Sequence, residues 1–444
     1  MQQPQHQLIP PQRLRRARIA DLRLRLDHLH HREQFVVAIA ALLAEDFQEG
    51  RARRRQRTCW VKPWLQRRVL LGQYDTLLHE LMRESQGDFK NYMRMDVDMF
   101  QELLARVSPR ITKCHNNRLP ICPGLKIEVT LRFLATGNSY ASLAYSFRVA
   151  HNTISLFVPE VCDAIVEEYR QQHFATPSNP DEWRDVADKF SSRWNLPHTC
   201  GALDGKHVAI RKPPRAGSRY YNYKGFHSIV IMALVDAEYK FLWANVGAEG
   251  ARSDAAIFQV CSLRLSLQEG TLGLPPAEPL PGDDRDTPFF IVGDDAFPLR
   301  HWLQKPFSLR DLTHDKRVYN YRLSRARRVV ENAFGILAST FRVLLTTLHV
   351  LPDNGQSVTK GCLVLHNILR TRYPNLRNED VDQDVDGMIV PGSWRNFGVL
   401  DDCQREGSTG ERCTRQGREL RQYLMHYVNS QAGKVPWQEA AIRI

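Results

Sequence analysis

The chain has 444 residues, of which 43% are hydrophobic and 9% aromatic, enough to form packed cores and to exclude wholesale disorder. Its 61 lysines and arginines against 49 acids give a net charge of +12, an excess typical of nucleic-acid-binding proteins, although solubility alone also explains it. No apolar stretch approaches the roughly 20 residues of a membrane span, and neither a secretory signal nor a C-x-x-C pair occurs. We therefore expect a soluble intracellular protein that does not enter a membrane.

Residues 1–67 form a predicted basic N-terminal tail. Residues 1–60 alone contain 12 arginines and six acids, so they carry half of the net charge. The run RARRRQR at 51–57 is typical of a nuclear import signal or of an arm that binds phosphates, and a solvated tail explains it equally well.

Residues 68–170 show helical periodicity and predict an all-helical domain. Within it, Glu128–Ile165 has the outline of a helix-turn-helix unit, with two helices joined by a short turn before a third. Its last two helices contain one cation, Arg148, against Glu160 and Asp163. A helix that grips phosphates is usually more basic, so packing or assembly is favoured over DNA reading.

Residues 195–372 change to a strand-rich pattern that predicts an α/β domain. The expected strands are His198–Ile210, Phe226–Asp236, Tyr239–Val246 and Phe289–Val292, with a helix at about Asp254–Leu267 before the fourth. Residues 268–288 are rich in proline, glycine and aspartate and predict a loop insertion, and long helices follow at about 321–341 and 357–372. This order is that of an RNase H-like mixed sheet, here preceded by the helical domain.

Residues 373–444 predict a linker and a C-terminal helix. The range 376–412 is polar and partly acidic, which is typical of a mobile linker, and Thr414–Asn429 is amphipathic.

Three acids in the α/β domain occupy positions that favour a shared site. Asp204 interrupts the first buried strand and is followed by Gly205, which allows a ligand or another chain segment to come close. Asp294 directly follows the fourth strand, at the edge where α/β sheets place ligands. Glu331 lies on the long helix. Taken singly, a turn, a cap and a helical ion pair explain these acids better, and only their joint placement favours a site.

Clustered carboxylates without histidine or cysteine suit Mg²⁺ or Mn²⁺. Two such cations about 3.5–4 Å apart would relieve the repulsion and act on a phosphodiester. Asp254 opens the helix after the third strand and is a fourth candidate metal ligand, although an acid favoured by the helix dipole is an equally good interpretation.

Basic residues accompany these acids, as a site for an anionic substrate requires. The predicted DNA-binding residues are Lys206 beside Asp204, Lys224 in the aromatic run YYNYKG, and Arg325 and Arg328 on the helix of Glu331. A solvated helix face is the alternative for the two arginines.

Five ordered blocks of this sequence resemble the PIF/Harbinger transposase superfamily, which includes the harbinger transposase-derived nucleases of animals. They are GALDGKHVAI, the stretch from YYNYKGF to SDAAIF, VGDDAFPL, the stretch from YNYRLSR to FRVL, and LVLHNIL. The similarity covers about residues 60–372 and returns at Val435–Gln438. Residues 295–297 (DAF) depart from the family's usual Ser-Gly-Tyr.

The resemblance implies a DDE nuclease core that cuts and joins DNA with divalent metal. It places Asp204, Asp294 and Glu331 on the catalytic triad and Asp254 on a further metal-associated acid. It also implies that a Myb/SANT-like protein supplies much of the DNA recognition and nuclear entry, so we expect the nucleus, with the cytoplasm and homo-oligomer formation left open. A catalytically silent, domesticated DNA-binding or scaffold protein is the first alternative, and a hydrolase acting on RNA is the second.

Overall fold

The computed structural model describes Gln34 and residues 61–113, 120–310, 312–375, 380–385, 388–403 and 413–442. The arginine-rich run at 51–57 and most of the predicted basic tail therefore lie outside the described residues. Pro63–Ile444 forms one compact unit, which contains everything described below.

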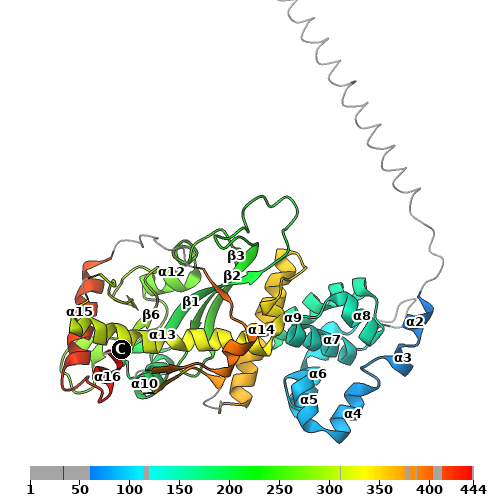
Figure 1. Ribbon diagram of the computed structural model, residues 1–444, viewed down its shortest axis with the longest axis horizontal. Helices are drawn as coiled ribbons and strands as arrows, with labels where there is room; N and C mark the ends of the chain where they lie inside the picture. Colours follow the sequence, from blue (N-terminus) through cyan, green and yellow to red (C-terminus); the bar gives the residue numbers. More distant parts are fainter. Residues whose placement is uncertain are drawn as a thin grey trace, which may run out of the picture. The chain divides into compact units, whose positions relative to one another are not determined.

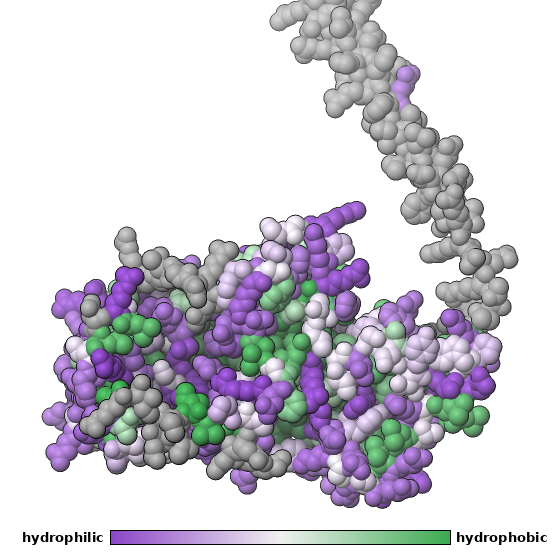
Figure 2. Space-filling view, in the orientation of Figure 1, coloured by the Kyte–Doolittle hydropathy of each residue, from purple (hydrophilic) through white to green (hydrophobic). Residues whose placement is uncertain are grey.

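Helices make up the part of this unit before the sheet (Figure 1). Capping side chains begin several of them: Asp96, for example, accepts a hydrogen bond of 2.8 Å from the backbone N–H of Met99. Figure 2 shows a mainly hydrophilic surface with an apolar patch over α3, where Val69, Leu70 and Leu71 are exposed. The helices are α2 (Pro63–Gln66), α3 (Arg68–Leu71), α4 (Leu77–Glu84), α5 (Gln86–Met93), α6 (Val97–Ile111), α7 (Pro123–Thr136), α8 (Tyr140–Phe147), α9 (His151–His173) and α10 (Pro180–Trp194).

Helices α7, α8 and α9 occupy the range predicted as a helix-turn-helix unit. Arg148 stands in the turn after α8 with a left-handed backbone (φ 52°), and its guanidinium donates hydrogen bonds to the backbone oxygens of Trp64 (2.8 Å) and Leu71 (3.3 Å). The single cation between residues 139 and 165 thus has a structural role, and DNA reading by the unit stays a prediction. Among the described residues, no lone helix meets the length and hydropathy of a membrane span, and α8 with α9 does so only across a bend of 103°.

A mixed sheet forms the core of the second half, as predicted, in the order β3-β2-β1-β6-β7. Strands β1, β2 and β3 form an antiparallel meander, and β6 and β7 add in parallel beside β1. A further short strand, β10, pairs with β1 off this path. The bounds are β1 (Thr199–Ala209), β2 (Ser228–Val235), β3 (Phe241–Glu249), β6 (Phe290–Val292), β7 (Leu303–Gln304) and β10 (Asp401–Asp402).

Helices cover both faces of this sheet. All eight residues of β2 are buried, and because alternate side chains point to opposite faces, neither face is open to water there. Helix α13 (His314–Thr340) runs across the strands in Figure 1 and packs on β1, β2 and β6, while α14 (Pro352–Arg372) packs on β2 and β3.

Several elements differ from their predicted bounds. The helix expected over 254–267 is divided into α11 (Asp254–Gln259) and α12 (Ser262–Glu269), since the Cys261 side chain caps the second. Helix α13 begins seven residues earlier than expected, because Thr313 caps it. Within the loop insertion, β4 (Glu278–Pro279) pairs with β5 (Asp286–Thr287).

The prediction of a mobile linker over 376–412 is wrong for its described residues. These contain β8 (Gln383–Val385), β9 (Met388–Val390), the 3₁₀ helix η3 (Ser393–Phe397) and β10, and they pack on α13 and β1. The indole N–H of Trp394 donates to the side chain of Asn332 at 2.9 Å, and its ring fills the space over Gly335. The predicted C-terminal helix is α15 (Arg415–Asn429), followed by α16 (Gln438–Ile442).

Candidate metal centre

Asp204, Asp254 and Asp294 come together beside β1. Each offers one carboxylate oxygen, and these oxygens all lie within 4.8 Å of one another. The three residues are only 4%, 1% and 1% exposed. The fold thus brings together Asp204 and Asp294, two of the three acids expected to converge, with Asp254, the fourth candidate.

Three local structures position the carboxylates. Asp204 lies within β1, whose residues around it are buried. Asp294 follows β6 and accepts a hydrogen bond of 2.9 Å from the backbone N–H of Ala296, which fixes the turn after the strand. Asp254 is the first residue of α11, which Ser253 caps. A strand centre, a strand end and a helix start therefore meet at one point.

Gly205 makes room for the third carboxylate. A Cβ atom at this position would overlap the carboxylate of Asp254. The structure thus agrees with the sequence inference that this glycine permits a close approach, and it identifies the approaching group.

Gly205→Ala is therefore expected to weaken Mn²⁺ binding by at least about tenfold, since the added methyl group must displace Asp254. Isothermal titration calorimetry with MnCl₂ measures the affinity. Gly87→Ala is the matched control, because a Cβ there meets nothing within 4 Å. Equal Mn²⁺ affinities for the two variants would show that the position of Asp254 does not matter for the ion.

The electrostatics of the group favour a bound cation. Both carboxylate oxygens of Asp254 are buried and have no hydrogen-bond partner among the residues that the structure describes. Burial, together with the charges of Asp204 and Asp294, raises the pKa of Asp254 well above its usual value. A buried carboxylate without partners is costly, and a divalent cation in contact with all three carboxylates would offset two of their three negative charges. Hard oxygen donors suit Mg²⁺ or Mn²⁺, so the residues fit the predicted cofactor.

Glu331, the third acid of the predicted triad, lies outside this group of three. It is located on α13 and is partly buried. Burial raises the pKa of Glu331, and the negative charge of Asp204 raises it further. The structure therefore places it within electrostatic reach of Asp204 without bringing it into the cluster. Sequence reasoning ranked Asp254 below Glu331, and the geometry reverses that order.

Lys206 is buried and forms an ion pair with Asp204 at 3.0 Å and a second with Asp402. Burial alone would lower the pKa of Lys206, but the two carboxylates raise it above its usual value. The neighbouring His207 has a pKa lowered to about 4 by burial, so the imidazole is neutral at physiological pH. Sequence reasoning missed Asp402, which belongs to the stretch predicted as a linker.

The other predicted DNA-binding residues also contact acids. Lys224 pairs with Asp401 at 2.7 Å. Arg325 and Arg328 lie 3.8 and 3.4 Å from the same carboxylate oxygen of Asp384, and their side chains are largely buried. The two arginines thus do not form a freely exposed track along α13.

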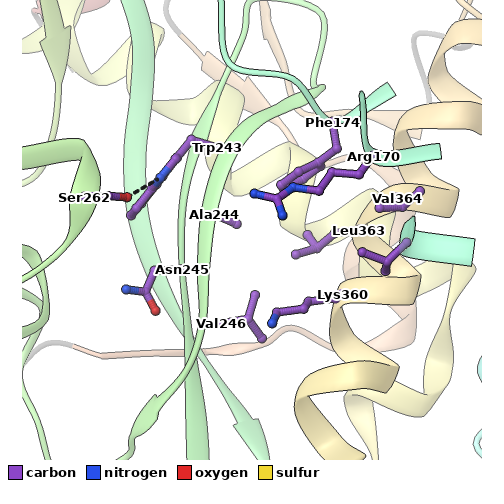
Figure 3. A pocket seen from close by; sticks show the side chains of 11 residues that line it. Arg170, Phe174, Trp243, Ala244, Asn245, Val246, Ser262, Lys360, Leu363 and Val364 are labelled. Atoms are coloured by element: carbon purple, nitrogen blue, oxygen red, sulfur yellow. Dashed lines mark hydrogen bonds between the residues drawn. The ribbon is translucent and has the colours of Figure 1, made fainter. Parts of the chain in front are cut away.

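A separate cavity of about 300 Å³ lies over β3, between β3 and α14, and Figure 3 shows its lining. Arg170 and Lys360 bring positive charge to it, and Trp243 donates a hydrogen bond to Ser262 at 3.2 Å. None of the clustered carboxylates lines this cavity, so it is separate from the candidate metal centre.

Comparison with known proteins identifies related sequences. Residues 203–367 match the family model described as "DDE superfamily endonuclease". A human protein named "Putative nuclease HARBI1" is 26% identical over 251 residues, which cover 56% of this chain and 67% of the relative. The Xenopus laevis protein of the same name is 26% identical over 62% of this chain and 75% of its own length. "Protein ALP1-like" of Arabidopsis thaliana is 26% identical over 57% of this chain and 62% of its own length. No solved structure matches the chain.

Proposed function

Because this chain belongs to the Harbinger transposase-derived family of DDE nucleases, we propose that it is a divalent-metal-dependent endonuclease that cleaves phosphodiester bonds in DNA and, if it retains transposase activity, also joins them. The observation that carries the proposal is the buried group of Asp204, Asp254 and Asp294, in which neither oxygen of Asp254 has a hydrogen-bond partner within the described part of the chain. A bound cation would stabilise such a group, whereas three carboxylates without a cation repel one another.

The order of the sheet supports the RNase H-like interpretation of the core. The sheet has an antiparallel meander of three strands, and the later strands β6 and β7 run parallel beside the first. The succession of elements is the one expected from the sequence for such a core. Asp204 on the central strand and Asp294 after the neighbouring parallel strand then lie side by side, as a DDE site requires.

Within this mechanism, Asp204, Asp254 and Asp294 would hold Mg²⁺ or Mn²⁺, and Lys206 would offset part of the charge of Asp204 at 3.0 Å. When bound, divalent cations supply Lewis acidity that activates a water or 3′-hydroxyl nucleophile and stabilises the leaving oxygen. We propose that two cations take part in this chemistry. Asp204 lies in a buried strand and Asp294 accepts a hydrogen bond from the backbone N–H of Ala296, so little reorganisation of these two carboxylates is needed when substrate binds.

We assign Glu331 to the site as an additional ligand, on the basis of its electrostatic interaction with Asp204. Glu331→Gln is expected to reduce the rise in melting temperature caused by Mn²⁺, because binding to the folded state stabilises it and the variant binds less tightly. Differential scanning fluorimetry measures the shift, with the exposed Glu269→Gln as control. An unchanged shift would exclude Glu331 from the ligands.

DNA is the proposed substrate, and a Myb/SANT-like partner is the proposed source of much of the target recognition and of nuclear entry. The involvement of Arg148 in backbone contacts supports this division, since it leaves the α8–α9 unit without a free cation among its described residues from 139 to 165. Homo-oligomer formation stays open.

The test of the proposed function is cleavage of supercoiled plasmid with Mg²⁺ or Mn²⁺ against an EDTA control. Nicking that requires the metal supports an endonuclease. DNA binding without any nicking favours the catalytically silent binder, and preferential cleavage of an RNA–DNA hybrid in competition with duplex DNA favours the RNA hydrolase.

A further inference from the structure

We call the described residues 380–385 and 388–403, which lie between α14 and α15, the strap. Its strand β10 occupies the edge of β1 beside Asp204. Strand β6 accompanies β1 only as far as Ala202, and β10 pairs with β1 at Lys206 and His207. The strap thus covers the part of β1 that β6 leaves open, next to the clustered carboxylates.

The strap places acids on the cations nearest to this edge. Asp402 pairs with Lys206, and Asp401 pairs with Lys224 at 2.7 Å. The hydroxyl of Tyr223 also donates to the backbone oxygen of Asp402 at 3.1 Å. The same short segment therefore binds both β1 and the aromatic loop that precedes β2.

The other half of the strap, around β8, places an acid beside the cations of α13. Asp384 of β8 accepts a hydrogen bond of 3.0 Å from Tyr321 and faces Arg325 and Arg328. All four cations predicted to bind DNA are consequently occupied by strap carboxylates. A carboxylate presents paired anionic oxygens to lysine and arginine much as a phosphate does, so DNA and the strap compete for the same groups.

We propose that the strap is an autoinhibitory competitor of DNA, and that residues 399–403 must leave β1 before a DNA backbone can reach Lys206 and Lys224. This inference rests on the proposed function, since it takes DNA as the ligand of that surface.

The structure indicates which part of the strap moves. The half around Trp394 is anchored, because the indole packs on Gly335 and hydrogen-bonds Asn332. By contrast, β10 is joined to β1 at only two residue pairs, and the Asp401 and Asp402 side chains are 47% and 58% exposed. Its flanking residues Leu400 and Cys403 are buried, so release of β10 would expose these two side chains. Displacing β10 leaves the order of the main sheet intact.

Asp401→Asn/Asp402→Asn removes the competing charges from exposed positions without removing side-chain volume. Asp185→Asn/Asp188→Asn is the matched control, because it makes the same change in net charge at exposed positions of α10. Binding of a fluorescent DNA duplex is measured by anisotropy with EDTA present, and nicking of plasmid is measured with Mn²⁺. The strap variant is expected to bind DNA roughly tenfold more tightly than the control variant and to nick faster at subsaturating DNA, because Lys224 loses its carboxylate partner and Lys206 keeps only Asp204.

Equal affinity of the two variants would overturn the proposal, and weaker binding by the strap variant would do so as well. Loss of nicking with tighter binding would also overturn it, by placing Asp401 or Asp402 in the catalytic machinery. If no variant nicks DNA but the strap variant binds more tightly, the strap proposal stands and the endonuclease proposal fails. Hydrogen exchange of the wild-type chain adds an independent readout: DNA should reduce the protection of amides in 399–403, and unchanged protection with DNA bound would contradict the release of β10.

Discussion

Asp204→Asn is expected to reduce metal-dependent nicking of plasmid DNA by at least about a hundredfold, since loss of a direct metal ligand should cost at least as much as loss of a group behind one. The substitution keeps the shape of the side chain and removes its charge from the centre of the carboxylate group. Lys206 retains its second partner, Asp402, so the fold should survive the change. Initial rates with Mg²⁺ and with Mn²⁺ give the effect.

The exposed Asp185→Asn is the control for charge, and circular dichroism checks that both variants remain folded. Nicking by Asp204→Asn at the wild-type rate would mean that the carboxylate group is not where the cleavage occurs. It would also point to a contaminating nuclease as the source of the activity.

Asp254→Asn is expected to stabilise the metal-free protein by about 1–3 kcal/mol at neutral pH, which is the usual cost of a buried polar group without a partner. The amide that replaces the carboxylate is neutral, and its N–H groups have the carboxylates of Asp204 and Asp294 nearby as acceptors. The same substitution removes one ligand, so the stabilisation by Mn²⁺ should largely disappear. Chemical denaturation with and without MnCl₂ measures both effects.

The pH dependence follows from the sign of the pKa shift. Because the folded state raises the pKa of Asp254, folding favours its protonated form. The metal-free wild type should therefore lose stability as pH rises from about 4, the pKa of an unfolded aspartate, to the raised value. Asp254→Asn should show less of this loss. Lower stability of the metal-free variant at neutral pH, or a full response to Mn²⁺, would contradict the assignment.

The parts of the site that could be predicted from the sequence are those next to long buried strands. Asp204 stands out because the apolar residues around it predict burial, and Asp294 because it directly follows the apolar run of β6. The first three strands were predictable for the same reason, since β1, β2 and β3 each have eight residues or more. Asp254 was ambiguous, because an acid at a helix start has an ordinary explanation in the helix dipole.

The strap was not predictable, because its elements are too short to produce a periodic pattern. Strand β10 has two residues, and its pairing with β1 depends on where β6 stops, which no local pattern reports. The ring of Trp394 occupies the space over Gly335, and it comes from a segment whose polar composition predicted a linker.

The most direct measurement of the central claim is the anomalous scattering of a crystal grown or soaked with Mn²⁺. The account predicts a manganese peak in contact with carboxylate oxygens of Asp204, Asp254 and Asp294. A fully occupied manganese peak elsewhere, with these three side chains unliganded at millimolar Mn²⁺, would contradict it.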